Sequence, residues 1–508
     1  MMPVGHALIP CSVFAMKPLL QTILAAFSLT LVPSSGSTQQ PNILFIAIDD
    51  LNDWIGCMGG HPQAHTPNID RLAARGMLFT NAHCASPACQ PSRAAVFTGM
   101  MPEKTGVWTN GKDSLSRMMP EAIKLPIPFE RAGYRAMGTG KLIHDTSDRD
   151  HPAVPDYVYV EQRWSPIPSK QARYTKEALP TKGSNNPRHL VTDSLGRQVV
   201  LPLNRMPSDR APEKLSGESF DWGPWDVPDS DFGDTRITDW AISKLEEEDD
   251  APLFLALGYY RPHIPLWAPK RFFDRFKEHP GQLPPVKEDD LDDLGETGKK
   301  WAREAVTAGA HASVVKHDQW SKAVEGYLAC TTYVDHEIGR LLDALDESSY
   351  RDNTIVVLWS DHGWHLGEKE HWGKWTGWER STKVPLIIAP PRSQAGKFAP
   401  AGSSCNQPVG LIDLYPTLTD LCGVKPPEGL DGQSLAPLLR NPDQKTGRKL
   451  VTVFDKGNHS VRTERWRYIL YQDGEEELYD HQGDPHEWNN LASNPEYRSL
   501  MNDLRRGL

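Results

Sequence analysis

Three apolar runs of strand length, each followed by polar residues, constrain the fold of this chain most strongly. They span residues 42–48, 253–257 and 354–359, and none of them alternates between apolar and polar positions. A run without alternation is typical of a strand buried on both faces, as in a parallel sheet covered by helices. Helical patterns lie between the runs, and Val334 and Ile338 belong to one such apolar stripe. Strands that alternate with helices predict an α/β fold with a mostly parallel central sheet.

The polar residues that follow these runs predict one shared site. Asp49 and Asp50 come directly after the first run, residues 258–263 after the second, and Asp361 and His362 shortly after the third. In α/β sheets, ligands bind beyond the carboxyl ends of the strands. Three carboxylates that meet there repel one another unless a cation lies among them, and their oxygens suit Ca²⁺ or Mg²⁺.

Length and net charge limit the kinds of protein that this chain can be. A chain of 508 residues permits a large core and more than one domain. The formal net charge of −11 argues against a nucleic-acid-binding protein, which needs a basic face. It does not exclude an anionic substrate, because a local cluster of basic side chains can reverse the field inside one cleft.

Residues 1–37 predict an export signal with an upstream extension. Lys17, an apolar stretch over 19–32 and the small residues after it follow the order of such signals. The apolar stretch is short and interrupted for a membrane span, although a retained anchor stays an alternative. Met16 is an alternative start to Met1. The mature protein is therefore expected to be exported, periplasmic or secreted, without a stable membrane span.

Seven cysteines are widely spaced and form no CxxC pair. Neither a zinc ribbon nor a disulfide scaffold is indicated. Cys405 and Cys422 are candidates for a disulfide, and the sequence leaves their pairing open.

The most specific motif lies at residues 89–93, which read Cys-Gln-Pro-Ser-Arg and are followed by Thr98 and Gly99. It resembles the signature of the type I, formylglycine-dependent sulfatases. In that family a maturation enzyme oxidises the cysteine to formylglycine (3-oxoalanine), whose hydrate attacks the sulfate ester. Cys89 is also expected at the start of a helix, where free N–H groups favour an oxyanion.

The resemblance extends over nearly the whole mature chain and is greatest to the iduronate-2-sulfatase-like enzymes. It implies an alkaline-phosphatase-like α/β sandwich with a small C-terminal antiparallel-sheet subdomain. The catalytic domain would span 41–432 and the subdomain 433–508, with strands near 450–454 and 467–471. Residues 145–235, rich in Pro, Asp, Ser and Trp, would form an irregular substrate-lid insert.

The family's metal ligands match four residues of this chain. They are Asp49, Asp50, Asp361 and His362, and an oxygen of the modified Cys89 would complete the shell. The family usually has Asn where His362 stands, and the histidine is typical of a subgroup. One Ca²⁺ per chain is the expected cofactor, with Mg²⁺ as the alternative.

Five further residues match positions around the sulfate. Arg93 would help hold the formylglycine hydroxyl ionised, and Lys141 and Lys374 would bind the sulfate. His144 would take the second proton of the diol, and His263 would protonate the leaving alcohol.

The predicted function is hydrolysis of a sulfate ester on a sugar of a sulfated polysaccharide or oligosaccharide. Several tryptophans near these motifs could pack on sugar rings or serve only in packing, namely Trp222, Trp225, Trp267, Trp375 and Trp378. One rival is a phosphonate monoester or phosphodiester hydrolase with the same nucleophile. Another is a catalytically dead sulfoglycan-binding protein. The sugar, the sulfate position, endo or exo action and the oligomeric state stay open.

Overall fold

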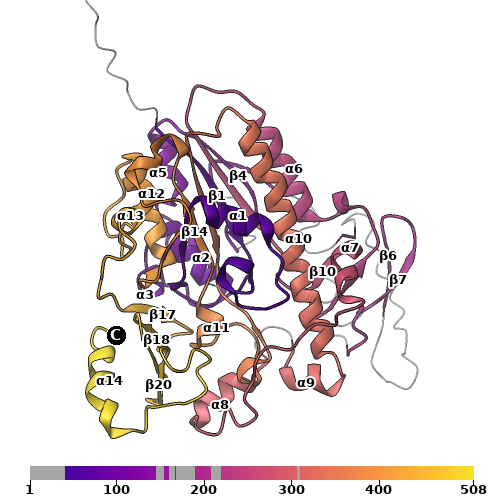
Figure 1. Cartoon of the computed structure of the whole chain (residues 1–508), viewed down its shortest axis with the longest axis vertical. Coiled ribbons are helices and arrows are strands. Elements are labelled where there is room, and N and C mark those ends of the chain that lie inside the picture. The colour runs from indigo at the N-terminus through magenta and orange to yellow at the C-terminus, as the bar shows by residue number, and fades with distance from the viewer. Residues whose placement is uncertain are drawn as a thin grey trace, which may run out of the picture. The chain divides into compact units, whose positions relative to one another are not determined.

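The centre of the protein is an eight-stranded sheet covered by helices (Figure 1). The structure is a computed structural model that describes residues 40–111, 113–144, 154–159, 166–167, 189–207, 219–305 and 309–508. The strand order is β15-β2-β14-β11-β1-β9-β4-β5. In chain order these strands are β1 (Asn42–Ile48), β2 (Met77–Phe79), β4 (Arg135–Gly140), β5 (Asp156–Val158), β9 (Leu253–Tyr259), β11 (Thr354–Ser360), β14 (Leu386–Ala389) and β15 (Ser403–Cys405).

Seven of these eight strands run in one direction, and β14 runs antiparallel to both of its neighbours. Strand β1 lies in the middle and is buried throughout. Phe45 and Ala47 point into one hydrophobic core, whereas Leu44 and Ile46 point into a second core on the opposite face. The predicted two-sided burial and mostly parallel sheet are confirmed.

Helices pack on both faces of the sheet. The first core is completed by α2 (Cys89–Thr98), α5 (Pro126–Arg131), α12 (Leu414–Cys422) and α13 (Ala436–Arg440). The second core is completed by α1 (Pro67–Arg75), α6 (Gly233–Leu245) and α10 (Trp320–Glu347). Figure 1 shows α5, α12 and α13 on one side of the sheet and α6 and α10 on the other. The predicted apolar stripe lies on α10, where Val334 and Ile338 pack in the second core.

A small antiparallel sheet, called the C-terminal sheet below, follows this sandwich. It consists of β17 (Leu450–Val453), β18 (His459–Arg462), β19 (Trp466–Leu470) and β20 (Glu476–Asp480). Its residues Val461 and Tyr468 pack against Met501 and Leu504 of α14 (Arg498–Arg505). The predicted α/β sandwich with a small C-terminal antiparallel sheet is confirmed.

The stretch 145–235 was expected to be irregular, and part of it lies outside the described residues. Its described part contains short strands. β6 (His189–Thr192) pairs with β7 (Gln198–Leu201), and β8 (Trp222–Trp225) pairs with β10 (Leu266–Pro269). The partner of β8 lies outside the stretch, so no local pattern indicates this pairing.

Shorter elements connect these parts. The remaining α-helices and strands are α3 (Pro102–Thr105), α4 (Leu115–Met118), α7 (Lys270–Phe273), α8 (Glu296–Arg303), α9 (His311–Lys316), α11 (Glu379–Thr382), β3 (Ala82–His83), β12 (His365–Leu366), β13 (Trp372–Gly373) and β16 (Val409–Gly410).

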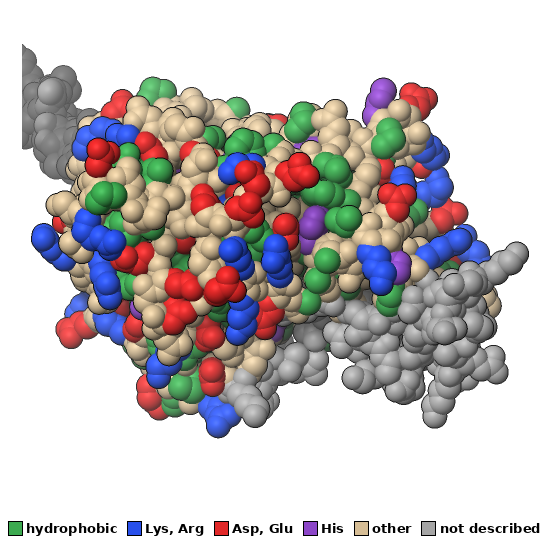
Figure 2. Space-filling view, turned by 90° about the horizontal axis from the view of Figure 1, so that it is seen from below, with side chains coloured by type: hydrophobic (Ala, Val, Ile, Leu, Met, Phe, Trp, Pro, Cys, Tyr) green, Lys and Arg blue, Asp and Glu red, His purple; other side chains and the backbone are tan. Residues whose placement is uncertain are grey.

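Acidic and basic side chains are interspersed on the face of the molecule shown in Figure 2. Among the described residues, no helix has both the length and the apolar character needed to cross a membrane. The predicted export signal over residues 1–37 lies outside the described residues.

The candidate disulfide between Cys405 and Cys422 is not formed, because both are free thiols. Cys405 lies in β15, where its Sγ donates to the carbonyl of Pro442 at 3.3 Å. Cys422 ends α12, and its Sγ lies 4.0 Å from the carbonyl oxygen of Pro41.

Candidate active site

Four strands of the central sheet end at one edge. Ile48 of β1 is in register with Ser360 of β11 and with Tyr259 of β9. Gly140 of β4 is in register with Gly258 of β9. The polar residues that follow these strands therefore meet at one edge, as the sequence predicts.

Cys89 places its thiol among these polar residues. It is the first residue of α2, as predicted, and its side chain is fully buried. Its Sγ lies 2.9 Å from Lys374 Nζ, 3.3 Å from His362 Nε2 and 3.5 Å from Asp49 Oδ1. The candidate nucleophile position is thus in direct contact with the residues expected to bind sulfate and metal.

Arg93 and Lys141 bring positive charge to the same pocket. The Arg93 Nε donates to Asp361 Oδ2 at 2.8 Å, and its Nη2 lies 3.4 Å from Asp49 Oδ1. Lys141 also donates to Asp49. All four side chains are buried. These pairs compensate charges that would otherwise be costly to bury.

Asp50 has one oxygen without a hydrogen bond. Its Oδ1 accepts from Lys374 Nζ at 2.7 Å, whereas its buried Oδ2 accepts no hydrogen bond. A buried carboxylate oxygen without a partner is costly, so this atom is suited to bind a cation.

His362 has the orientation of a metal ligand. Its Nδ1 lies 3.0 Å from the carbonyl oxygen of Gly363, which can only accept, so Nδ1 carries the proton. Its Nε2 faces Asp50 Oδ1 at 3.3 Å and Asp361 Oδ1 at 3.6 Å. Metal-bound histidines are commonly oriented by such a bond from their other ring nitrogen.

Two overlapping groups of side chains could hold an ion. One group is Asp49, Cys89, Asp361 and His362, and the other is Asp49, Asp50, Cys89 and His263. In each group the ligand atoms lie within 4.8 Å of one another. The two groups together contain every residue predicted as a metal ligand. Their carboxylate oxygens suit a hard divalent cation. The sequence did not indicate that His263 would join one of these groups.

The pocket changes the protonation of its residues. Burial disfavours the charged form of Cys89, but the ammonium groups of Lys141 and Lys374 outweigh it and lower the pKa of the thiol well below its usual range. Burial likewise opposes the charge on Lys374, but Asp50 and Cys89 raise its pKa above the usual range. Lys374 therefore keeps its positive charge.

The two candidate histidines contact different parts of the site. His144 interacts with the Cys89 thiol, and burial lowers the pKa of His144, so its neutral form is favoured. The Nδ1 of His263 donates to the carbonyl of Ile264 at 2.5 Å. Its Nε2 lies 3.7 Å from Asp50 Oδ2, and the side chain is 15% exposed. His144 therefore lies beside the thiol and His263 beside Asp50, and both residues are partly exposed.

Two residues that support the site were not predicted. Ser92 donates from Oγ to the carbonyl of Asp361 at 2.5 Å and so ties α2 to the loop after β11. Tyr327 of α10 donates to the carbonyl of Asp50 at 2.7 Å and accepts from the amide of Asn52 at 2.8 Å. Ser92 lies inside the motif and could have been found there, but no local signal connects Tyr327 with a loop far away in sequence.

The five tryptophans considered for sugar stacking differ in their exposure to solvent. Trp222, Trp225, Trp267 and Trp378 are buried and serve in packing. Trp375, directly after Lys374, is partly exposed. It lines a cavity of about 760 Å³.

Comparison with known proteins identifies the family. The sulfatase family model matches residues 41–424, and a second model, N-sulphoglucosamine sulphohydrolase, C-terminal, matches residues 367–508. The chain is 35% identical over 476 residues to a sulfatase of Formosa agariphila, covering 92% of this chain and 86% of that protein. It is 28% identical over 426 residues to iduronate 2-sulfatase of Homo sapiens, covering 78% of this chain and 71% of that protein.

Solved structures share the fold. One is a complex with the substrate D-glucosamine-2-N,6-O-disulfate, with a TM-score of 0.67 at 21% identity over 92% of this chain and 96% of that one. Another is the phosphonate monoester hydrolase of Agrobacterium radiobacter, with a TM-score of 0.69 at 22% identity over 91% and 94% of the two chains. The fold alone does not distinguish sulfur from phosphorus chemistry. The match of the family model over most of the chain, together with the Formosa agariphila relative, shows that the chain belongs to the sulfatase family, whose members are sulfuric ester hydrolases.

Proposed function

We propose that this sulfatase removes sulfate from a sugar of a sulfated polysaccharide or oligosaccharide, using a formylglycine formed from Cys89 and one Ca²⁺ per chain. The observation that carries the proposal is the position of the Cys89 thiol. It is buried at the start of a helix, 2.9 Å from Lys374 Nζ and 3.3 Å from His362 Nε2. A side chain in this position can meet both a sulfate anion and a metal ion.

The modified cysteine would supply the nucleophile. Hydrated formylglycine carries a geminal diol, one oxygen of which can attack sulfur while the other later allows sulfate to leave. Arg93 lies near the position where this group would stand, since it bonds the carboxylates on either side of Cys89. Lys374 and Lys141 provide the positive charge that attracts the anionic sulfate ester and stabilises negative charge as it develops.

Asp49, Asp50, Asp361 and His362 would hold the cation. Three carboxylates and one oriented imidazole suit Ca²⁺, with Mg²⁺ as the alternative. A bound divalent cation supplies Lewis-acid polarisation of the sulfate oxygens.

His263 and His144 would move the protons. His263 is partly exposed, with its Nε2 3.7 Å from Asp50 Oδ2, and it would protonate the alcohol as it leaves. His144 lies beside residue 89, and partial burial favours its neutral form, so it can accept a proton from the diol after the alcohol has left.

These roles predict different losses for the two histidines. His263→Ala is expected to lower the rate on a sugar sulfate by about 10²–10⁴-fold, but much less on nitrophenyl sulfate, whose alcohol leaves without help. His144→Ala should release about one equivalent of alcohol quickly and then turn over slowly, because its step follows alcohol release. Rapid-mixing kinetics on both substrates measure the rate losses and the burst of alcohol release. Equal losses on both substrates for His263→Ala, with the burst in that variant instead, would show that the roles are reversed.

A sugar substrate is supported by a cavity that is lined by Trp375, the residue after Lys374. Its lining also includes Trp301, several polar side chains and three carboxylates, namely Thr109, Thr297, Lys300, Asn458, Gln472, Glu304, Asp455 and Asp473. A volume of about 760 Å³ lies in the range of small-molecule sites. Indole and amide groups together suit the apolar faces and hydroxyls of a sugar ring. Several relatives are named for glycan sulfates, including an ulvan-active sulfatase and a delta 4,5-hexuronate-2-O-sulfatase.

The proposal is tested by offering one alcohol as its sulfate, phosphate and phosphonate esters. A sulfatase should show the highest kcat/KM on the sulfate ester, and a panel of defined sulfated sugars should then identify the glycan. Preference for the phosphonate ester would favour the related hydrolase chemistry. Absence of turnover on all esters would favour a sulfoglycan-binding protein.

We also propose that the protein is exported to the periplasm or secreted and matured by a formylglycine-generating enzyme. The predicted signal over residues 1–37 and the motif at Cys89 support this. The proposed domains are a catalytic domain over 41–432 with a lid over 145–235, and a subdomain over 433–508. The separate core of the C-terminal sheet and α14 supports the last division.

A further inference from the structure

Lys374 is followed by a short segment whose backbone conformation is unusual. Nζ is buried, 2.7 Å from Asp50 Oδ1 and 2.9 Å from Cys89 Sγ. The next residue, Trp375, has a φ of 79°, a backbone conformation that residues with side chains rarely adopt. Such a conformation persists only where the surrounding structure holds it.

The C-terminal sheet holds this segment through the carbonyl of Gly377. Ser460 of β18 donates to this oxygen from Oγ at 2.6 Å, and Arg467 of β19 donates to it from Nη1 at 2.9 Å. Arg467 also donates to Ser460 Oγ at 2.5 Å. Side chains from two adjacent strands thus donate to the carbonyl of Gly377, which lies three residues after Lys374.

Further bonds fix the residues after Gly377. The indole of Trp378 donates to Glu477 Oε2 of β20 at 2.7 Å. The amide of Glu379 donates to Glu487 Oε2 at 2.8 Å. The first turn of α11 is therefore bound to the same subdomain.

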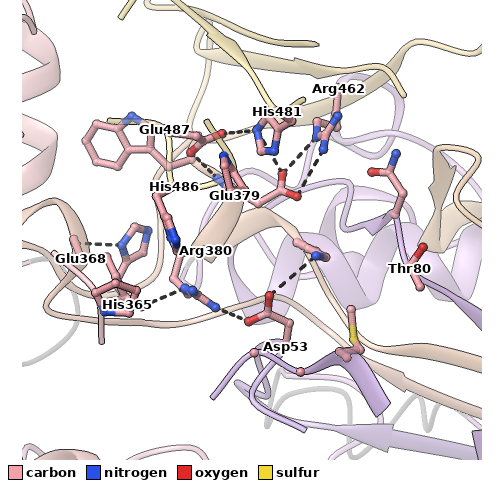
Figure 3. A pocket seen from close by; sticks show the side chains of 18 of the residues that line it. Asp53, Thr80, His365, Glu368, Glu379, Arg380, Arg462, His481, His486 and Glu487 are labelled. Atoms are coloured by element: carbon pink, nitrogen blue, oxygen red, sulfur yellow. Dashed lines mark hydrogen bonds and ion pairs between the residues drawn. The ribbon is translucent and has the colours of Figure 1, made fainter. Parts of the chain in front are cut away.

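Arg467 balances the charges in this contact. It is fully buried, it donates to Glu379, and its Nε lies 2.6 Å from Glu487 Oε1. Figure 3 shows Glu379, Arg462, His481 and Glu487 pointing toward one another at the edge of a cavity. The side chains of Glu379, His481 and Glu487 have nitrogen or oxygen atoms within 4.8 Å of one another. Arg467 already pairs with both carboxylates, however, and Arg462 pairs with Glu379. The cluster is therefore suited to fix a backbone segment rather than to bind a cation.

The opposite side of the segment is bonded to the active site. The amide of Trp375 donates to the carbonyl of Pro87, two residues before Cys89, at 3.0 Å. His371 Nε2 lies 2.9 Å from the carbonyl oxygen of Lys374. The segment thus connects the C-terminal sheet with the loop that carries the candidate nucleophile.

We propose that Ser460 and Arg467 are positioning residues for Lys374, so that the C-terminal sheet is part of the catalytic apparatus. Neither side chain contacts Lys374 or Cys89, and both reach the active site through the segment 374–379, although Arg467 also donates to Thr382 Oγ1 at 2.9 Å. The inference rests on the proposed role of Lys374 in binding sulfate.

The test is a double-mutant cycle on the matured enzyme with one sulfate ester. Ser460→Ala and Arg467→Lys are each expected to lower kcat/KM about tenfold to a hundredfold, since small misplacements of a binding group have such effects. In a Lys374→Met background the same changes should cost less than about twofold, because the group that they position is gone. Arg465→Ala is the matched control, since Arg465 pairs with Asp480 on the surface of the same sheet and should leave kcat/KM unchanged.

The outcomes separate the two proposals. If Ser460→Ala and Arg467→Lys cost the same factor with and without Lys374, they act through general stability and the inference is wrong. Full activity of both variants would also overturn it. If Lys374→Met itself keeps full activity, the proposed role of Lys374 fails. If Arg467→Lys does not fold, the test rests on Ser460→Ala alone. This variant removes one hydroxyl and no charge, so it should still fold.

Discussion

Cys89→Ala is expected to retain the fold and to lose at least about three orders of magnitude in turnover, because the covalent route is removed. The thiol lies at the start of α2 and within hydrogen-bonding distance of Lys374 and His362. Alanine fills the same helical position without a group that can be converted to the nucleophile. Steady-state sulfate release, with circular dichroism and thermal unfolding to confirm the fold, measures the effect.

Cys84→Ala is the matched control for this variant. Cys84 is a buried free thiol five residues earlier in the chain, and it packs in the first hydrophobic core. Its replacement should leave turnover unchanged apart from a modest loss of stability. Turnover by Cys89→Ala at the level of the parent enzyme would contradict the proposed nucleophile.

Removal of the metal is expected to abolish activity and to lower the temperature of unfolding. A cation that binds only the folded state stabilises it by mass action, so its chelation lowers the free energy of unfolding. Asp361→Asn should weaken metal binding because it removes one negative charge. It should lower stability modestly without unfolding the protein, since the amide oxygen can accept from Arg93 Nε while its NH2 group then faces the backbone amides of Asp50 and His362. Isothermal titration with Ca²⁺ and with Mg²⁺ after chelation measures the affinity of each variant.

Asp352→Asn provides the comparison for the metal site. Asp352 precedes the opposite end of β11, is exposed and pairs with Arg351. This variant should bind the metal as the parent enzyme does. Normal activity of exhaustively chelated protein would show that Asp49, Asp50, Asp361 and His362 are not metal ligands.

The sequence predicts the central sheet well because its signals are local. The runs that form β1, β9 and β11 are apolar at successive positions, and such runs are buried on both faces in the structure. Since parallel strands end at one edge, the convergence of Asp50, Asp361 and Cys89 follows from the strand ends and one motif.

The contacts between distant segments could not be predicted. The bond from Tyr327 to the carbonyl of Asp50 joins residues 277 positions apart, and the bond from Arg467 to Gly377 joins residues 90 apart. Neither pair belongs to a periodic pattern or a short motif. The same holds for the tryptophans, since only packing distinguishes the buried Trp378 from the partly exposed Trp375.

The central claim is that residue 89 must become formylglycine for this protein to release sulfate. The direct measurement compares protein made with and without a formylglycine-generating system. Fragment mass spectra of the tryptic peptide 76–93, in which Cys84 serves as an internal reference, give the converted fraction at residue 89. Ion chromatography gives the sulfate released from a defined sulfated sugar or a nitrophenyl sulfate. We predict that sulfate release scales with the converted fraction and is absent from unconverted protein. Equal sulfate release from both preparations, or complete conversion without sulfate release from any ester, would contradict the account.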